Sequence, residues 1–142
     1  MTDSERAKEI LYDPSAHHTC VLCKGDTVYA SEKTGIAPMM DLLDSGAELS
    51  GFCAADRIVG RAAAMLFVLA GVRSLYAEVI TEGAIRILTE NGISYAYQTR
   101  TEQIVNRRGD GPCPMESAVA KVENPAQARE EIRKTLQELT KK

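Results

Sequence analysis

The sequence lacks tryptophan, and aromatic residues of any kind are few. Two Phe and five Tyr among 142 residues leave little surface on which nucleic-acid bases could stack. An excess of positive charge is also missing, because 17 Lys and Arg stand against 20 Asp and Glu. A phosphate backbone requires a basic surface, so we expect no nucleic-acid partner.

Long apolar runs and a secretory leader are missing as well. No run reaches the roughly 20 apolar residues that span a membrane, and residues 1–9 are charged where a signal peptide has its apolar segment. We therefore expect no membrane association and a cytoplasmic location. Four cysteines in a chain of this length and location predict free thiols rather than disulfides. The length itself favours a single domain over residues 1–142.

The most informative segment is the apolar run that follows Arg61. Residues 62–71 carry no polar side chain, which predicts a central helix buried on all sides. We expect this helix to begin near Ala55, so that Asp56, Arg57 and Arg61 lie in its first turns. Charges buried there without partners would cost several kcal/mol, and the helix start is therefore where we expect a ligand.

Strand and helix signals alternate along the rest of the chain. We predict helices at 4–12, 37–44, 81–91, 114–122 and 125–139, a β-hairpin of strands 19–23 and 27–31, and further strands at 51–55, 72–80 and 93–97. A strand–helix–strand unit implies a right-handed crossover and a parallel strand pair. The expected fold is a three-layer α/β/α sandwich with a mixed sheet, whose first two strands are antiparallel.

Three motifs together resemble the DUF1893 family. They are Ser31-x-x-x-Gly35-Ile-x-Pro38, Ala55-Asp-Arg-Ile-Val-Gly-Arg-Ala62 and Asn106-Arg-x-x-x-x-Pro112-Cys-Pro-Met-Glu116. The resemblance covers residues 8–122 of a single DUF1893-like domain and leaves the last predicted helix, 125–139, outside. It implies a fold similar to that of the cytidine deaminase superfamily.

The zinc ligands of that superfamily are missing from the positions where the resemblance would place them. It needs His or Cys at the start of the central helix and Cys-x-x-Cys at the start of the next helix. Here the predicted helices open with residues 55–58, Ala-Asp-Arg-Ile, and 81–84, Thr-Glu-Gly-Ala. A catalytic zinc takes three protein ligands, so we expect no metal, no other cofactor and no zinc-dependent deamination. Glu82 is either a ligand-facing acid or a charge of the first helical turn.

Most candidate residues have both a structural and a functional interpretation. Asp56, Arg57 and Arg61 form either a buried cap with an internal ion pair or an anion-binding site at a helix N-terminus. We expect Arg57 and Arg61 to share one helix face. Gly60 permits close approach of a strand or a ligand, or serves packing inside the helix. Ser31 and Gly35 line a pocket or belong to a surface loop.

Cys113 is the candidate for covalent chemistry. With Pro114 in the first helical turn, Cys113 lies near the N-cap, where a thiolate is favoured. We expect Glu116 to reach back to this cap as in a capping box. The structural alternative is a helix start with a buried thiol. Cys20 and Cys23, three residues apart on a strand, point to opposite faces and predict no metal site.

These observations favour a domain that binds a small polar or anionic molecule on a deaminase-like scaffold. The ligand is nucleotide-related by fold analogy alone. We expect the start of the central helix to meet the turn at 113–116. The predicted ligand-binding residues are Ser31, Gly35, Asp56, Arg57, Gly60, Arg61, Asn106, Cys113 and Glu116. One alternative is an enzyme with Cys113 as nucleophile and Asp56 or Glu116 as proton carrier. Another is a homo-oligomer that associates through a sheet edge or the last helix.

Overall fold

A mixed five-stranded sheet forms the centre of the computed structural model, which describes residues 1–104 and 113–140. Its strands are β1 (Cys20–Lys24), β2 (Thr27–Ser31), β3 (Cys53–Val59), β4 (Ser74–Thr81) and β5 (Ser94–Thr101). They lie in the order β2-β1-β3-β4-β5. β1 is antiparallel to β2 and to β3, whereas β3, β4 and β5 are parallel. The predicted mixed sheet with an antiparallel first pair is confirmed.

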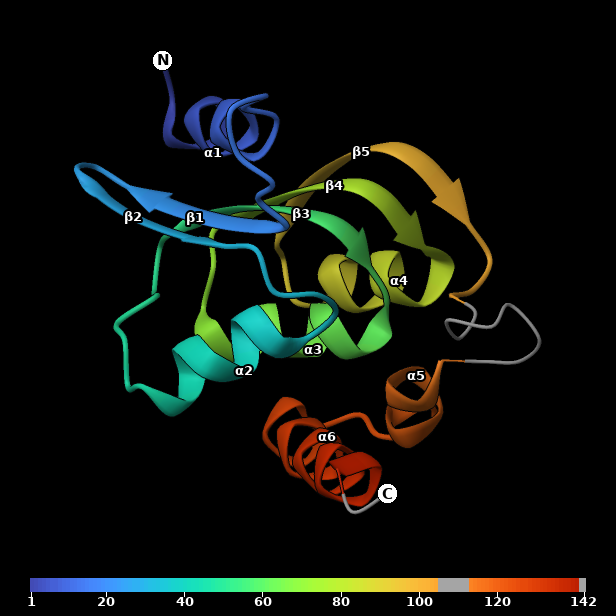
Figure 1. The fold of residues 1–142 in the computed structure, drawn as a ribbon. Coiled ribbons are helices and arrows are strands. Elements are labelled where there is room, and N and C mark those ends of the chain that lie inside the picture. The colour runs from blue at the N-terminus through green and yellow to red at the C-terminus, as the bar shows by residue number, and fades with distance from the viewer. Residues whose placement is uncertain (105–112, 141–142) are drawn as a thin grey trace.

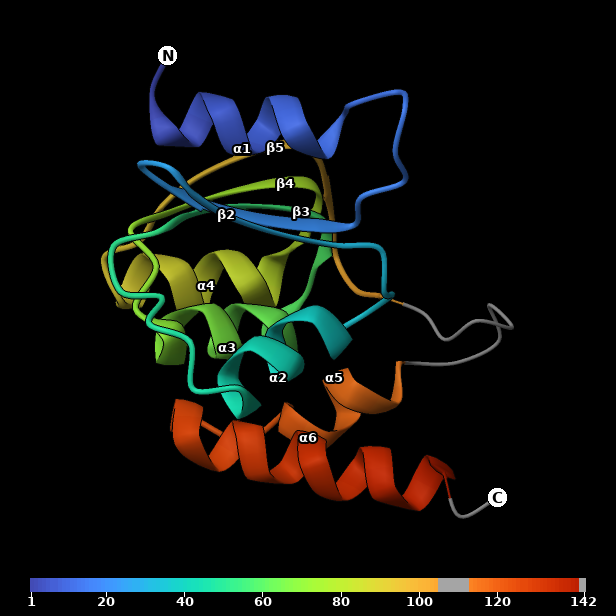
Figure 2. The same ribbon diagram turned by 60° about the vertical axis from the view of Figure 1, so that its left-hand side comes forward.

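Helices cover both faces of this sheet (Figure 1). They are α1 (Asp3–Leu11), α2 (Ala37–Asp44), α3 (Arg61–Ala70), α4 (Glu82–Glu90), α5 (Pro114–Val119) and α6 (Pro125–Thr140). α1 lies alone on one face, and α2, α3 and α4 lie on the other (Figure 2). α5 and α6 lie beneath α3, on its side away from the sheet. The predicted α/β/α sandwich therefore holds, with an additional outer layer.

Each face of the sheet has its own hydrophobic core. The larger core lies on the α3 side and includes every α3 residue from Ala62 to Phe67. The smaller core joins α1 to the sheet through Leu11, Val21 and Cys23. Cys20 belongs to the larger core and Cys23 to the smaller one, which confirms that these two cysteines point to opposite faces. No helix in the described ranges is long and apolar enough to cross a membrane.

Helix ends follow the capping signals of the sequence. The Thr81 hydroxyl accepts a hydrogen bond from the Ala84 N–H at 3.1 Å, and Asn124 Oδ1 accepts one from the Ala126 N–H at 2.9 Å. Gly71 ends α3 in the left-handed region, at φ 79°, where glycine has no steric penalty. These caps confirm the predicted start of α4, start of α6 and end of α3.

The predicted start of the central helix is wrong. Residues Cys53–Val59 form β3, and α3 begins only at Arg61. Ala55 pairs with Val21 on one side and with Tyr76 on the other, so hydrogen bonds to two neighbouring strands outweigh the helical propensity of residues 54–57. Gly60 has an extended backbone and is the N-cap of α3. Asp56 and Arg57 are thus sheet residues.

Candidate functional site

The N-terminus of α3 is capped by a side chain from α5. Glu116 Oε1 accepts a hydrogen bond from the Arg61 N–H, and Glu116 Oε2 accepts one from the Ala62 N–H, both at 2.7 Å. A carboxylate suits this position, because the first N–H groups of a helix lack partners and form its positive end. The expected capping box is wrong, because the Glu116 side chain caps α3 and not α5, the helix to which Glu116 belongs.

Gly60 makes this contact between α3 and α5 sterically feasible. A Cβ atom at Gly60 would lie 2.2 Å from Glu116 Oε1 and 2.6 Å from Ile104 Cδ1, distances that real Cβ atoms do not reach. Close approach is therefore observed at Gly60, but of a side chain rather than of the strand or ligand that we expected. The approaching group belongs to Glu116 of the same chain.

Arg61 completes a reciprocal contact between α3 and α5. Its Nε donates to the Val119 carbonyl oxygen at 2.9 Å, and its Nη2 donates to the Val122 carbonyl oxygen. Its guanidinium lies 3.5 Å from the Glu123 carboxylate. Carbonyls at a helix C-terminus favour a cation, so Arg61 fixes the end of α5 while Glu116 fixes the start of α3. The predicted meeting of the central helix with the turn at 113–116 is confirmed.

Arg57 lies on the opposite face of the sheet, against α1. Its Nη2 donates to the Leu11 carbonyl oxygen at 2.9 Å and its Nε donates to the His18 carbonyl oxygen at 3.1 Å. Its Nη1 lies 3.2 Å from the Glu78 carboxylate, and its guanidinium stacks over the Tyr12 ring. Arg57 and Arg61 do not share a face, because only Arg61 is helical. Both bind main-chain carbonyls of this chain.

Asp56 is buried on the face that carries α3. Its Oδ1 accepts a hydrogen bond from the Arg57 N–H at 2.8 Å. Burial raises the pKa of Asp56 to about 8, against the opposing effect of main-chain hydrogen bonds from Arg57 and Ile58. Asp56 is therefore mostly a neutral acid at pH 7. Burial, with a smaller contribution from Asp56, also raises the pKa of the Cys20 thiol.

Ser31, Cys20 and Asp56 stand in one row across the sheet. Cys20 pairs with Ser31 of β2 on one side and with Asp56 of β3 on the other, so their side chains share one face. Next to this row a groove of about 300 Å³ opens between β2 and α2. Gly35 forms the turn before α2 with φ 64°. The groove is lined by Cys20, Val28, Tyr29, Ala30, Ser31, Pro38, Asp41 and Leu42.

Sequence reasoning missed most of this groove. Tyr29 was within reach, because the two-residue period of a strand places it on the same face as Ser31. Asp41 and Leu42 join the site only because α2 packs beside β2, a tertiary contact that no local pattern indicates. A second hollow, of about 670 Å³, lies over α1 and includes Glu5, Lys8 and Tyr12 but none of the predicted site residues.

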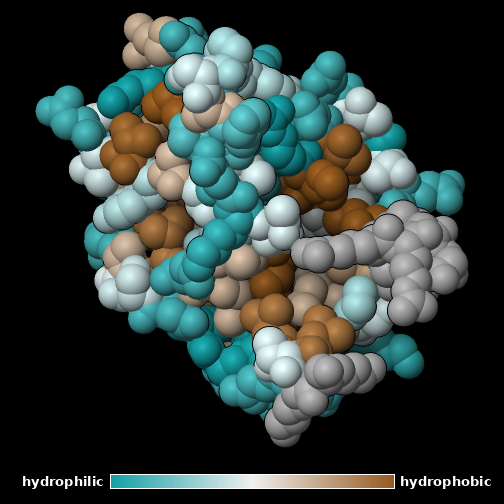
Figure 3. Space-filling view, in the orientation of Figure 1, coloured by the Kyte–Doolittle hydropathy of each residue, from teal (hydrophilic) through white to brown (hydrophobic). Residues whose placement is uncertain are grey.

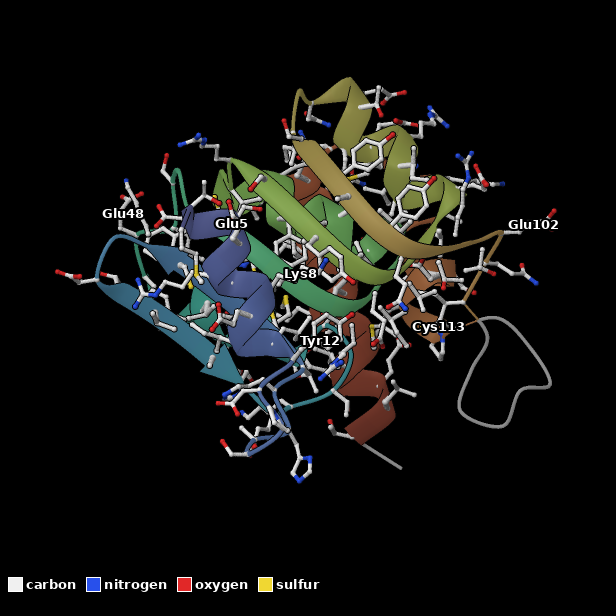
Figure 4. All side chains as sticks on the ribbon, turned by 90° about the horizontal axis from the view of Figure 1, so that it is seen from above. Glu5, Lys8, Tyr12, Glu48, Glu102 and Cys113 are labelled. Atoms are coloured by element: carbon white, nitrogen blue, oxygen red, sulfur yellow. The ribbon has the colours of Figure 1, made fainter. Side chains whose placement is uncertain are left out.

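Cys113 lines neither the groove nor the hollow over α1. It is the N-cap of α5 and is half-buried, whereas Cys20, Cys23 and Cys53 are buried. Figure 4 places it near the start of α5, to the right of Lys8 and Tyr12 of α1. The predicted N-cap position is thus confirmed. Asn106, the remaining predicted residue, lies outside the described residues.

The start of α4 offers no metal-binding arrangement. Glu82 pairs with Arg100, which lowers the pKa of Glu82, so it is engaged within the chain as a charge of the first turn. Within residues 1–104 and 113–140 no group of three or more His, Cys, Asp or Glu could hold a metal ion. Elsewhere on the molecule, the surface between α2 and α5 is partly hydrophobic (Figure 3).

Known proteins add a family and a fold. The model of DUF1893, a domain of unknown function, matches residues 6–136. A crystal structure of a DUF1893 family protein from Thermotoga maritima has a TM-score of 0.81 and 23% identity, covering 97% of this chain and 91% of that one. A dCMP deaminase from cyanophage S-TIM5, in apo form, has a TM-score of 0.45 and 13% identity, covering 69% and 90%. No curated protein matches the chain.

Proposed function

The chain belongs to the DUF1893 family, and we propose that it is a non-catalytic domain that binds a small polar molecule between β2 and α2. The groove there carries the proposal. Its size, about 300 Å³, lies at the lower end for small-molecule sites. Its apolar walls include Pro38 and Leu42, and its polar groups include Ser31, Tyr29 and Asp41. Apolar walls with a few polar groups are typical of such sites.

The charges at the rim indicate which ligands would fit. Lys33 Nζ lies 2.6 Å from Asp41 Oδ2, so the rim offers one cation and one carboxylate. Ser31 Oγ accepts a hydrogen bond from the Lys33 N–H at 3.1 Å. A ligand with an apolar or aromatic body could donate a hydrogen bond to Asp41 and place an anionic group beside Lys33. Nucleosides and nucleotides have this combination, and we place them first among the ligands to test.

This proposal changes the roles of the predicted residues. Ser31 lines the groove, and Asp56 lies behind Cys20 as a mostly neutral acid. Arg57 and Arg61 hold α1 and α5 in place through main-chain carbonyls. The observed contacts thus favour ligand contact by Ser31 and a supporting role for both arginines.

A matched pair of substitutions on β2 tests the groove. Ser31 lines the groove, whereas Thr27, at the other end of the same strand, is exposed and does not line it. Ser31→Leu therefore fills the groove, whereas Thr27→Leu lies outside it. Thermal unfolding is measured for wild type and both variants with a panel of nucleosides, nucleotides and inorganic phosphate. We expect one class of compound to raise the melting temperature of wild type and of Thr27→Leu, and to lose its effect with Ser31→Leu.

If no compound in the panel raises the melting temperature, the chain does not bind these ligands. If a compound raises the melting temperature of Ser31→Leu as much as that of wild type, it binds elsewhere on the molecule.

A cysteine-dependent enzyme is the second candidate, because Cys113 is the least buried cysteine and caps α5. Such an enzyme needs a proton acceptor near the thiol. Glu116, one predicted proton carrier, has each carboxylate oxygen bound to an N–H of α3. Asp56, the other, is buried beside β1 and accepts a hydrogen bond from the Arg57 N–H. These contacts favour the binding function over the enzymatic one.

A further inference from the structure

β5 forms one edge of the sheet and is exposed along almost its whole length. Seven of its eight residues, Ser94–Arg100, are exposed. Its inner side pairs with β4 from Ser74 opposite Ser94 to Thr81 opposite Thr101. In Figure 1 it lies at the end of the sheet, beyond β4. Its outer side therefore presents backbone N–H and C=O groups that no other strand of the described chain pairs.

The sequence of β5 has little that would prevent pairing. Natural edge strands are protected by lysine, proline, bulges or short length. β5 runs Ser-Tyr-Ala-Tyr-Gln-Thr-Arg-Thr, with no lysine, no proline and one charge, Arg100. The opposite edge strand, β2, is shorter at five residues and lies beside the groove and α2. The edge at β5 is thus the one suited to a further strand.

Two tyrosines add a specific contact to this edge. Tyr95 and Tyr97 have ring centroids 6.4 Å apart and planes inclined by 17°. Their exposed fractions are 37% and 40%, and both rank among the exposed large hydrophobic side chains of the described chain. Aromatic pairs across neighbouring strands stabilise a sheet, so this stack can continue onto an added strand that itself carries aromatic residues.

We infer that β5 pairs in antiparallel fashion with β5 of a second copy of this chain, with Tyr97 on the two-fold axis. This register overlaps residues 94–100 of both copies. It sets Tyr97 against the partner's Tyr97, and it sets Arg100 against the partner's Ser94. Side chains of one face stay together, and the two sheets become one continuous sheet. A two-fold contact of this kind is self-complementary.

The charges beside β5 favour a second copy as the partner. α4 packs against β5. It ends at Glu90, four residues before β5 begins at Ser94, and Glu82 at its start is bound to Arg100 near the other end of β5. Glu90 also pairs with Arg86 at 2.9 Å. The two-fold rotation brings each Arg100 to the partner's Ser94 end, where Glu90 and the C-terminal carbonyls of α4 lie. Opposite charges therefore meet, and no charged residue within 94–100 faces a like charge.

Light scattering coupled to gel filtration tests the inference. We expect wild type to show twice the 15.5 kDa mass of one chain at high concentration. Tyr97→Lys and Tyr97→Glu are each expected to be monomeric, because like charges meet on the axis. Their mixture is expected to dimerise, because unlike charges meet there. Thr27→Lys, on the exposed start of β2, is the control and should leave the dimer intact.

Hydrogen exchange of wild type provides a readout without any substitution. The amides of residues 94–100 should exchange more slowly at high than at low concentration, whereas those of β2 should not change. A monomeric mass at every concentration, or a dimer that survives Tyr97→Lys, would overturn the inference. So would a Lys–Glu mixture that stays monomeric. The ligand assays on the β2 groove are independent of these outcomes.

Discussion

Glu116 and Arg61 hold α3 and α5 together in both directions. The Glu116 carboxylate accepts the N–H groups that begin α3, and the Arg61 guanidinium donates to carbonyls at the end of α5. Fifty-four residues of sequence separate Glu116 from Ala62. The contact therefore fixes the outer helices to the centre of the fold, and its loss is expected to lower stability.

Glu116→Ala should reduce the free energy of unfolding. It leaves two helical N–H groups without their carboxylate acceptor, at a cost of roughly 1–3 kcal/mol. Glu116→Gln keeps one acceptor oxygen and should cost less. Urea denaturation measures both. Glu123→Ala is the control, because Glu123 is 65% exposed and a surface pair contributes at most about 1 kcal/mol. Equal losses for Glu116→Ala and Glu123→Ala would contradict the capping role.

Gly60→Ala tests the close approach in the same region. The added methyl group overlaps Glu116 and Ile104, and overpacking costs roughly 1–3 kcal/mol. Gly83→Ala is the matched control, since a Cβ there meets Arg61 Cβ at an ordinary 3.5 Å. In a helix that substitution is neutral or stabilising by up to about 1 kcal/mol. If Gly60→Ala unfolds at the same urea concentration as wild type, the packing described for Gly60 is wrong.

Asp56 should make stability fall as pH rises. Its pKa is about 8 in the folded chain and its ordinary value is 3.8, so folding takes up a proton between these limits. The contribution of Asp56 to the free energy of unfolding is fully present below pH 4 and is lost as the pH rises toward 8. The slope there is about −1.4 kcal/mol per pH unit for one proton. Asp56→Asn, which resembles the protonated acid, should flatten this decline in urea unfolding measured from pH 4 to 9.

Asp44 provides the opposite control. Hydrogen bonds from Arg133 and Arg129 lower the pKa of Asp44 to about 2, so its contribution is present above pH 4 and is lost as pH falls. Asp44→Asn should alter only the acid limb of the profile. A decline between pH 4 and 8 that persists unchanged in Asp56→Asn would assign it to another group.

Cys113 should react with iodoacetamide faster than the other three cysteines, but no faster than a free cysteine in solution. Cys20, Cys23 and Cys53 are buried, and burial raises the pKa of Cys20 and of Cys23, so their labelling should be slower by at least about tenfold. The measurement is the rate at each cysteine by mass spectrometry at pH 7, with N-acetylcysteine as reference. A binding domain predicts that Cys113 reacts no faster than the reference. Labelling of Cys113 well above that rate would favour the enzymatic alternative.

Much of the fold follows from local patterns. The hairpin of β1 and β2, the Pro38 start of α2, the Thr81 cap and the Asn124 cap depend on neighbouring residues, and each was predictable. The family also follows from short motifs. The meeting of the central helix with the turn at Glu116 was predictable in outline from those motifs.

The boundary between β3 and α3 was not predictable from local patterns. Its helix start depends on Glu116 and Ile104, which approach Gly60 from distant segments. Ala55 and Asp56 become strand because β1 and β4 lie on both sides of them. The groove between β2 and α2 was not predictable for the same reason, because it also depends on contacts between distant segments. The contacts of Arg57 and Arg61 with main-chain carbonyls, and the packing of α2 beside β2, arise only when the chain is folded.

The most direct test of ligand binding is an NMR titration of ¹⁵N-labelled protein with the nucleoside and nucleotide panel. We predict that one ligand class shifts the amide signals of Cys20, Tyr29, Ser31 and Leu42 together, with one dissociation constant. We also predict that Ser31→Leu abolishes these shifts and Thr27→Leu does not. No shift with any compound, or shifts centred on Cys113 and α5, would contradict it.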